Sequence, residues 1–388
     1  MAKTSSKPTH SVASLGQIEA FAPTLVAWQA KHGRHHLPWQ RTRNPYHVWL
    51  SEIMLQQTQV ATVMGYFERF LEQLPTVQAL AAAPQAQVMA LWAGLGYYSR
   101  ARNLHACAQD VVHRFGGQFP STAAELETLP GIGPSTAAAI ASFCFAQPVS
   151  IYDGNVKRVL SRLLAFGGDL SGSNANKQLH AQAQALVAGL DQSPQHLAQS
   201  MPRYTQGLMD LGATLCHLKA PLCQQCPVHA LCEASKAGQP TGYPFKTKKI
   251  KRSSERWYLL LLDRGDAVWL EQRGNTGIWG GLQAPLVFAE LAAACDWLGD
   301  NGWGALGATP PALAELAQPS IKHQLTHKEL FLTPIVLSAP PAVATAIKAD
   351  YLNQCADGPV SGAWVAKGQA LQAALPAPVK KWLQLAGY

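Results

Sequence analysis

Apolar residues recur at helical spacing in successive segments from about residue 21 to residue 166, and again over residues 178–190 and 204–211. Glycine and proline interrupt this pattern, because neither residue continues a helix readily. The interruptions fall at Gly33, Pro45, Pro75, Pro84, Gly94, Gly96, Gly116, Gly117 and residues 131–134. The pattern predicts an all-α domain over residues 17–233.

After residue 254 the pattern changes to short apolar runs that are typical of strands. Two of these runs flank Asp263-Arg264-Gly265-Asp266, and this arrangement predicts a β-hairpin. The predicted strands are residues 257–262, 267–271, 329–337 and 362–365, and the predicted helices are residues 288–298 and 379–385. Residues 255–388 are therefore predicted to form an α+β domain.

Polar segments lie before and between the two domains. Residues 1–16 are rich in Ser, Thr and Lys and are predicted to form a flexible tail, whereas residues 234–254 are predicted to form a basic linker. The cations of the linker are Lys246, Lys248, Lys249, Lys251 and Arg252. Such a run is either a solvated tether or a contact to phosphate, and the sequence alone leaves both open.

The composition excludes several classes of protein. With 388 residues, 48% of them hydrophobic, the chain is long enough for two cores and is not a disordered protein. It has no apolar run near the ~20 residues that cross a bilayer, and residues 1–16 lack the apolar stretch of a signal peptide. We therefore expect a cytoplasmic protein. The net charge of +8 is as compatible with solubility as with nucleic-acid binding.

Four cysteines form the pattern C-x6-C-x2-C-x5-C near the end of the helical region: Cys216, Cys223, Cys226 and Cys232. Four thiolates from one short loop suit a tetrahedral metal site or a [4Fe-4S] cluster, while a disulfide pair or inert thiols is the alternative. Two C-x2-C pairs would favour zinc, and this spacing does not contain them. The other cysteines are scattered, as expected in a reducing compartment: Cys107, Cys144, Cys295 and Cys355.

The segment LPGIGPSTA at residues 129–137 opens an Ala-rich helix. Gly131 and Gly133 permit a tight turn and leave amide N–H groups unshielded at the helix N-terminus, where an anion is favoured. This pattern predicts a phosphate-binding helical hairpin. The alternative is a turn that binds nothing.

Two carboxylates stand where a catalytic role is chemically sensible. Glu52 has Val48, Trp49, Leu55 and Gln56 on its predicted helical face, and apolar surroundings raise the pKa of a carboxyl group. A Glu at the edge of the stripe, paired with an arginine, is the alternative. Asp153 precedes a helix and is predicted to be its N-cap, where helix N–H groups support the negative charge that stabilises a sugar cation.

These motifs together resemble the MutY-type adenine DNA glycosylases of the helix-hairpin-helix (endonuclease III) superfamily. The matching segments are SEIMLQQTQV at 51–60, GLGYYSRARNL at 94–104, LPGIGPSTA at 129–137 and DGNVKRVL at 153–160, together with the cysteine loop and RGNTGIWGGL at 273–282. The resemblance implies a multidomain protein: an all-α helix-hairpin-helix glycosylase domain, with an iron-sulfur loop at residues 216–232, followed by an α+β Nudix-like domain.

The resemblance further implies a base-excision repair enzyme that removes adenine mispaired with 8-oxoguanine or guanine in double-stranded DNA. Glu52 would protonate the base at N7 and then activate water, Asp153 would stabilise the oxocarbenium-like sugar, and Asn155 would position this apparatus. The four cysteines would hold a [4Fe-4S] cluster. A monomer located in the bacterial cytoplasm and acting on the nucleoid is expected, and the sequence predicts no particular protein partner.

The implied DNA contacts come from several segments. Tyr97, in a loop with two tyrosines and two arginines, is predicted to enter the base stack, although a tyrosine pair packed between helices is the alternative. The remaining implied contacts are Gln56, Gln57, Gly131, Gly133, Ser135, Lys157 and His327. Bifunctional members of the superfamily have a nucleophilic lysine where this chain has Ser135, so a monofunctional enzyme is predicted. Lys157 is expected at most to trap an abasic product slowly.

The second domain lacks the Nudix pattern G-x5-E-x7-R-E-x2-E-E after Gly281, so no magnesium-pyrophosphate site is expected. The family senses the oxidised guanine with a Phe-Ser-His loop, and the matching segment here is Leu325-Thr326-His327. Three rival functions are an endonuclease III-like pyrimidine glycosylase with lyase activity, a DNA-binding scaffold without chemistry and a nucleotide pyrophosphatase. Ser135 argues against the pyrimidine glycosylase with lyase activity. The two carboxylates argue against the scaffold, and the missing glutamates argue against the pyrophosphatase.

Overall fold

The structure is a computed structural model that describes residues 12–248, 252–274, 276–301, 310–338 and 362–388. Residues 1–11 of the expected tail, residues 249–251 of the linker and Cys355 lie outside the described residues. The chain divides into two compact units, residues 1–82 with 103–249 and residues 83–102 with 250–388.

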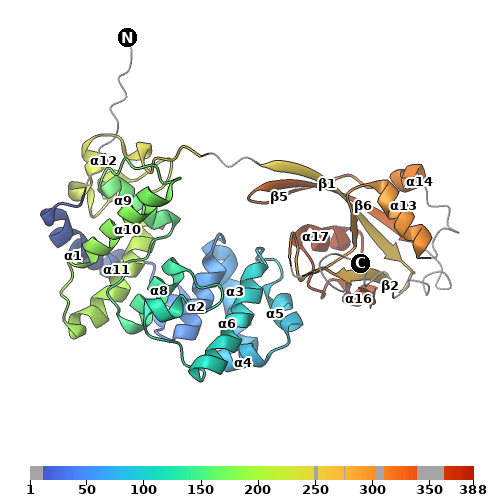
Figure 1. Cartoon of the computed structure of the whole chain (residues 1–388), viewed down its shortest axis with the longest axis horizontal. Helices are drawn as coiled ribbons and strands as arrows, with labels where there is room; N and C mark the ends of the chain where they lie inside the picture. Colours follow the sequence, from blue (N-terminus) through green and yellow to red (C-terminus); the bar gives the residue numbers. More distant parts are fainter. Residues whose placement is uncertain (1–11, 249–251, 275, 302–309, 339–361) are drawn as a thin grey trace, which may run out of the picture. The chain divides into compact units, whose positions relative to one another are not determined.

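The chain up to the linker is helical, as the apolar spacing predicts (Figure 1). Its α-helices are α1 (Leu15–His32), α2 (Pro45–Leu55), α3 (Val60–Gln73), α4 (Val77–Ala82), α5 (Gln85–Trp92), α6 (Ser99–Phe115), α7 (Ala123–Leu126), α8 (Pro134–Phe145), α9 (Gly154–Leu163), α10 (Ser173–Val187), α11 (Pro194–Thr214) and α12 (Glu233–Lys236). Short 3-10 turns are η1 (Pro38–Arg41), η2 (Cys223–Gln225), η3 (His229–Leu231) and η4 (Pro240–Gly242).

Helix α11 is the element on which α1, α8 and α9 pack. Its apolar face, which includes Tyr204 and Leu208, is fully buried. Gly207 allows α1 to approach closely, because a Cβ atom there would lie 2.8 Å from Cγ of Leu25. Burial of such side chains contributes roughly 1.5–3 kcal/mol each. The first turns of α8 and α9 are thereby fixed relative to α2, which packs on α8.

The chain after the linker forms a mixed sheet with helices. The strands are β1 (Ser253–Asp263), β2 (Ala267–Gln272), β3 (Gln283–Ala284), β4 (Leu286–Phe288), β5 (Ile321–Gln324), β6 (Lys328–Ser338) and β7 (Gly362–Ala366), and the helices are α13 (Leu291–Asp300), α14 (Pro310–Glu315), α16 (Lys367–Ala370) and α17 (Ala377–Leu385). The strand order is β3-β2-β1-β6-β5, with β4 on β1 and β7 on β2. β1 pairs in parallel with β6, from Ser253 opposite Lys328 onward, while the other pairs are antiparallel.

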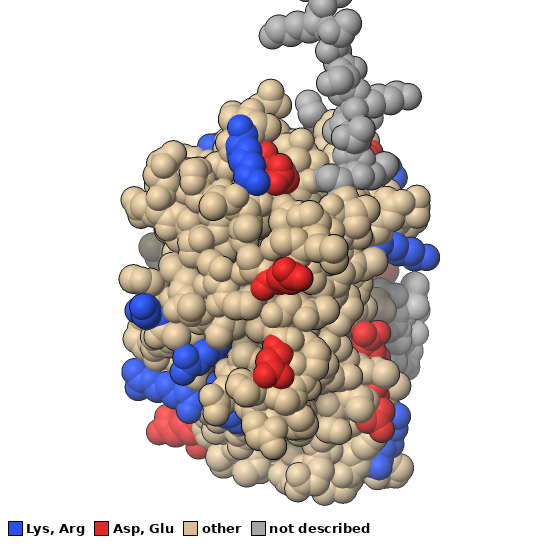
Figure 2. Space-filling view, turned by 90° about the vertical axis from the view of Figure 1, so that its left-hand side faces the viewer, with Lys and Arg blue, Asp and Glu red and all other residues tan. Residues whose placement is uncertain are grey.

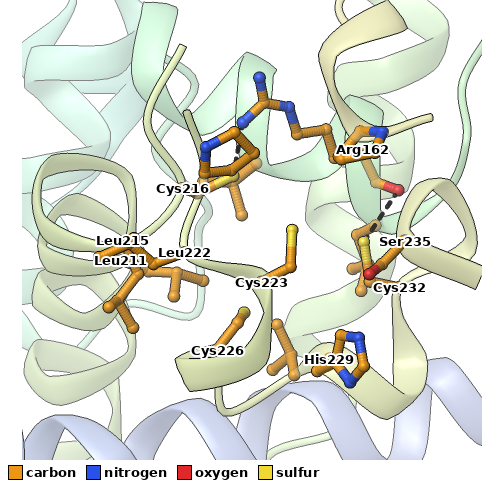
Figure 3. A pocket seen from close by; sticks show the side chains of 15 residues that line it. Arg162, Leu211, Leu215, Cys216, Leu222, Cys223, Cys226, His229, Cys232 and Ser235 are labelled. Atoms are coloured by element: carbon orange, nitrogen blue, oxygen red, sulfur yellow. Dashed lines mark hydrogen bonds between the residues drawn. The ribbon is translucent and has the colours of Figure 1, made fainter. Parts of the chain in front are cut away.

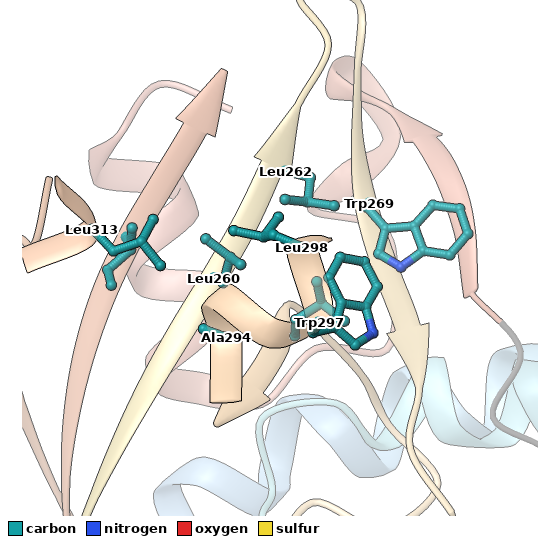
Figure 4. Close-up of a cluster of buried hydrophobic side chains, with 9 residues drawn as sticks. Leu260, Leu262, Trp269, Ala294, Trp297, Leu298 and Leu313 are labelled. Carbon is teal, nitrogen blue, oxygen red and sulfur yellow. The ribbon is translucent and has the colours of Figure 1, made fainter. Parts of the chain in front are cut away.

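Leucines and tryptophans from β1, β2 and α13 form a core of this region (Figure 4). Its buried members are Leu260, Leu262, Trp269, Leu286, Ala294, Trp297, Leu298, Leu313 and Ile335. The hairpin predicted at residues 263–266 is confirmed by the pairing of β1 with β2. The helix predicted from residue 288 is wrong at its start, because Phe288 ends strand β4 opposite Tyr258 and α13 begins at Leu291. An apolar Leu-Val-Phe run gains ladder hydrogen bonds there that a helix start would not offer.

Charged side chains are sparse and scattered on the face that Figure 2 presents, so the net charge of +8 is not concentrated on that face. In the part of the chain that the structure describes, no helix is long and apolar enough to cross a membrane.

Candidate active site and cysteine loop

A cavity of about 340 Å³ brings together residues that the sequence predicts to be catalytic. Glu52 enters it from α2, Ser135 from the first turn of α8, and Asp153 and Asn155 from the start of α9. Thr136 and Gln56 also line the cavity, and Gln56 Nε2 donates to Thr136 Oγ1 over 3.3 Å. Three helices distant in sequence therefore place two carboxyl groups in one pocket.

Glu52 lies in the apolar environment that the sequence predicts. Burial first, and the nearby Asp153 carboxylate second, raise the pKa of its carboxyl group to about 8. Among the described residues, the ion pairs do not include Glu52, so the alternative of an edge pair with arginine has no support. Helix α2 ends at Leu55, so Gln56 lies in the following loop and not on the helical face predicted for it.

Asp153 is the N-cap of α9, as predicted, and its Oδ1 accepts a hydrogen bond of 2.8 Å from the Val156 amide. The preceding residue is held by α8, because the Tyr152 amide donates to Ser135 Oγ over 3.1 Å. Ser135 therefore fixes the backbone next to the carboxylate. This contact gives the serine a structural task at a position where an amine would be a nucleophile.

Asn155 is connected to the beginning of the cysteine loop through Arg158. The Arg158 guanidinium donates to Asn155 Oδ1 over 2.9 Å, to the Cys216 carbonyl over 2.8 Å and to the Gly212 carbonyl over 2.9 Å. A planar guanidinium fixes the directions of all three bonds. The orientation of the Asn155 amide in the pocket thus depends on the conformation of the chain at Cys216.

Sequence reasoning missed a polar wall of the same pocket. Arg34 lines the cavity and pairs with the fully buried Asp210 over 2.7 Å, and Gln206 Nε2 donates to the same carboxylate over 2.9 Å. Trp39 completes this side of the cavity. Asp210 could have revealed this wall, because it is a carboxylate inside the apolar pattern of α11. Glu52 was identified from the same kind of pattern.

The helical hairpin has the predicted backbone. Gly131 has a φ of 74°, and a Cβ atom there would meet Cβ of Asn103 at 2.6 Å, so only glycine fits. Gly133 is the N-cap of α8, and the space around its Cα is open. The first turn of α8 is therefore accessible to an anion.

Two of the predicted DNA contacts have a left-handed backbone. Gln57 has a φ of 57° and Tyr97 a φ of 49°, and both side chains are exposed. Such a conformation costs about 1–3 kcal/mol for a residue with a Cβ atom and is concentrated at functional sites. Nearby bonds hold the Tyr97 loop, since the Arg100 guanidinium donates to the Leu95 and Gly96 carbonyls.

Two further predicted contacts lie on the surface. Lys157 Nζ lies 4.6 Å from the centre of the Tyr152 ring. His327 is exposed in the turn between β5 and β6, where its carbonyl accepts from the Ser253 amide.

The four cysteines line one small cavity of about 30 Å³ with leucines from α11 and the loop (Figure 3). Arg162 from α9 also lines it, and its guanidinium donates to Cys216 Sγ over 3.2 Å and to the carbonyls of His217 and Leu218. This arginine is 2% exposed. A buried guanidinium needs compensating negative charge, and thiolates bound to a metal centre would supply it.

The donor set of the loop fits a group that is held by several thiolates. The four cysteines line one apolar cavity, and each iron of a [4Fe-4S] cluster would take one thiolate. Among the described residues, no group of three or more His, Cys, Asp and Glu side chains is placed to hold a single metal ion.

Comparisons with known proteins agree with this architecture. Residues 50–188 match the HhH-GPD superfamily of base excision DNA repair proteins, and residues 257–385 match the NUDIX domain. These two family matches define the class, a helix-hairpin-helix DNA glycosylase with an added Nudix-like domain. A solved structure of a thermostable thymine-DNA glycosylase aligns with a TM-score of 0.49 at 24% identity, over 57% of this chain and 98% of that chain.

Curated relatives narrow this class. The adenine DNA glycosylase of Buchnera aphidicola subsp. Baizongia pistaciae is 34% identical over 318 residues, which are 81% of this chain and 85% of the relative. The human adenine DNA glycosylase is 44% identical over 234 residues, which are 58% of this chain and 41% of the human protein. The chain belongs to the adenine DNA glycosylase family and is a hydrolase of N-glycosyl bonds.

Proposed function

We propose that this protein removes adenine from double-stranded DNA in which the adenine is mispaired with 8-oxoguanine or guanine, without efficient strand cleavage. The observation that carries the proposal is the pair of carboxyl groups in one cavity. Burial raises the pKa of Glu52 to about 8, so this group holds a proton at neutral pH. Asp153 accepts a hydrogen bond from the Val156 amide in the first turn of α9 and lines the same cavity.

The chemistry follows from these two environments. The adenine nucleotide leaves the base stack, at a cost of a few kcal/mol. Glu52 gives its proton to N7, the bond between C1′ and N9 breaks, and the bonding electrons leave with the protonated base. Asp153 stabilises the positive charge on the sugar, while Glu52, now a carboxylate, takes a proton from the water that attacks C1′. This sequence is the two-carboxylate logic of glycoside hydrolysis.

Positioning and base recognition are proposed for the residues around the two carboxylates. Asn155 orients the reacting sugar, held by Arg158. Gln56, Gln57 and Tyr97 fill the gap left in the duplex. The amide groups at Gly131, Gly133 and Ser135 bind a backbone phosphate at the start of α8.

The absence of efficient lyase activity is proposed from Ser135. A hydroxyl at this position cannot form the Schiff base that leads to strand cleavage. Lys157 is the lysine of α9. Burial lowers the pKa of its amine most, the charge of Lys246 also lowers this pKa, and the Asp153 carboxylate raises it. A slow covalent trap at Lys157 is compatible with this arrangement.

The cysteine loop is proposed to hold a [4Fe-4S] cluster through Cys216, Cys223, Cys226 and Cys232. The bound cluster would close an irregular loop that has little apolar surface of its own. The buried Arg162 would then face a centre with thiolate ligands. Residues 17–233 would act on the base, and residues 255–388 would read the opposite strand through His327, with the enzyme a monomer. The cytoplasmic location stays a prediction.

Single-turnover base release tests the function. The substrates are duplexes with adenine opposite 8-oxoguanine, adenine opposite guanine, and thymine glycol, each analysed with and without alkali. Alkali-dependent cleavage at adenine, fastest opposite 8-oxoguanine, is expected. Cleavage at thymine glycol without alkali would indicate the endonuclease-like rival, and binding without base release would indicate the scaffold.

A cysteine variant tests the cluster. Cys223→Ser is expected to lose the visible iron-sulfur absorption and most bound iron, whereas Cys295→Ser, on α13, is the matched control and keeps both. Zinc instead of iron in the purified protein, determined by elemental analysis, would refute the cluster.

A further inference from the structure

Residues 245–248 of the basic linker are hydrogen-bonded to residues 169–171 of the helical region. The carbonyl of Phe245 accepts from the Leu170 amide over 3.0 Å. The amide and hydroxyl of Thr247 donate to the two oxygens of Asp169 over 3.1 and 2.5 Å, and the Lys248 amide donates to Ser171 Oγ over 3.1 Å. Residues 245–248 therefore do not behave as a free tether.

Asp169 organises this attachment. Its carboxylate also accepts from the Ser171 amide over 2.9 Å, and hydrogen bonds from Thr247 and Ser171 hold the pKa of the group well below its usual range. In the described part of the chain, the salt bridges do not include Asp169. The negative charge of this residue thus serves the linker backbone and neutralises no particular cation.

Two cations lie on or beside α9. Lys157 is on this helix, one turn after Asp153, and the Arg162 guanidinium of the same helix donates to the Tyr243 carbonyl over 3.2 Å, which fastens the chain just before residues 245–248 to α9. The charge of Lys246 acts on Lys157. Lys157 Nζ also contacts the Tyr152 ring, which stacks on His180 with centroids 4.8 Å apart. Both Lys246 and Lys248 are exposed.

Like charges held in proximity repel each other, and an anion between them removes that cost. A solvated tether has no need for four hydrogen bonds that hold it on the helical region. We propose that residues 245–248 form a DNA-phosphate site, in which Lys246 and Lys157 bind the backbone beside the extruded nucleotide. Asp169 is the positioning residue of this site. The inference rests on the proposed function, since DNA must be the ligand.

Salt dependence of binding is the appropriate readout. Each phosphate contact contributes about 0.9 to the slope of log K against log salt. The duplex carries a non-hydrolysable adenine analogue opposite 8-oxoguanine, and fluorescence anisotropy measures its affinity for the full chain. Lys246→Ala is expected to lower the slope by about 0.9 and the affinity on the order of tenfold at 0.1 M salt.

The variant Asp169→Ala separates a net-charge effect from a positioning effect, because the two predict opposite changes in DNA affinity. Removal of a negative charge strengthens DNA binding if only net charge matters, whereas loss of the attachment weakens it and lowers the slope. Asp191→Ala is the matched control, because Asp191 is an exposed aspartate that accepts from the Ser193 amide over 2.8 Å and does not touch the linker. The control is expected to bind as tightly as the wild type or slightly more tightly.

The double variant Lys246→Ala/Asp169→Ala completes the cycle. If Asp169 acts by placing Lys246, the two losses are not additive. Unchanged slopes in Lys246→Ala, or equal or tighter binding in Asp169→Ala, would overturn the proposal. Failure of the proposed function is distinct, because wild-type protein would then release no adenine at all.

Discussion

The pocket around Glu52 and the turn between β5 and β6 are built in opposite ways. In the pocket, α2 and α9 place two carboxyl groups in one cavity; the Val156 amide donates to Asp153, and Ser135 of α8 holds the backbone at Tyr152. In the turn, Leu325–His327 join two strands, and His327 is exposed. The pocket raises the pKa of Glu52 through burial, while the turn holds the His327 side chain exposed to whatever binds there.

This difference separates two kinds of energetic effect. A buried acid changes the barrier of the chemical step, because its proton is delivered only at the reacting atom. An exposed side chain that recognises a base donates a hydrogen bond to one base and not to another, and such discrimination is worth about 1–3 kcal/mol. Substitutions in the pocket should therefore change the rate of base release, and substitutions in the turn should change mainly the preference between mispairs.

The largest expected effect belongs to Glu52→Gln. The amide cannot supply the proton to N7, so single-turnover release of adenine should fall about 10³-fold or more, while affinity for the mispaired duplex changes by less than about threefold. Glu68→Gln, an exposed glutamate on α3, is the control and should behave as the wild type. If Glu52→Gln releases adenine at a rate within tenfold of the wild type, the Glu52 proton does not control the chemical step and the contrast with the turn fails.

A smaller loss is expected from Arg158→Met. This change removes the three hydrogen bonds that fix Asn155 relative to Gly212 and Cys216. A displacement of about 1 Å at a reacting centre costs on the order of 10²-fold, so the rate constant of base release should fall by about that factor. Affinity for the duplex is the second measurement. Arg69→Met, which removes an exposed arginine whose guanidinium lies over the Tyr66 ring, should leave the rate unchanged.

The next prediction concerns the dependence of stability on pH. The pKa of Glu52 is raised in the folded state, to about 8, so its contribution to stability is complete below the unfolded pKa and is lost as the pH rises through 8. Between pH 5 and pH 9 the Tm of the wild type should therefore decline relative to that of Glu52→Gln, which has no proton to lose. A constant difference in Tm over this range would show that Glu52 is not buried as described.

The sequence predicted the pocket better than it predicted the surroundings of the pocket. Glu52 could be found because a carboxylate is unusual in an apolar stripe of a helix. Asp153 could be found because an acid at the start of a helix is a common N-cap. Arg34 and Gln206 could not, since their role arises only when α11 packs beside α1. The element boundaries show the same limit.

Local propensity predicted the helices, and tertiary pairing decided the exceptions. The second domain's first helix is predicted from residue 288, yet residues 286–288 pair antiparallel with β1 as strand β4. The attachment of the linker to Asp169 also depends on residues far apart in sequence, which no composition of the linker reveals. Long-range contacts of this kind are what a pattern of apolar positions cannot encode.

The smallest expected effect belongs to His327→Ala. If the exposed turn reads the base opposite adenine, the preference for 8-oxoguanine over guanine should fall about tenfold, while adenine opposite guanine is processed at the wild-type rate. Lys322→Ala, on β5, removes an exposed side chain of the same strand pair and should keep the preference. An equal loss on both mispairs would place His327 in general DNA binding, whereas an unchanged preference would assign lesion discrimination to residues other than those of the turn.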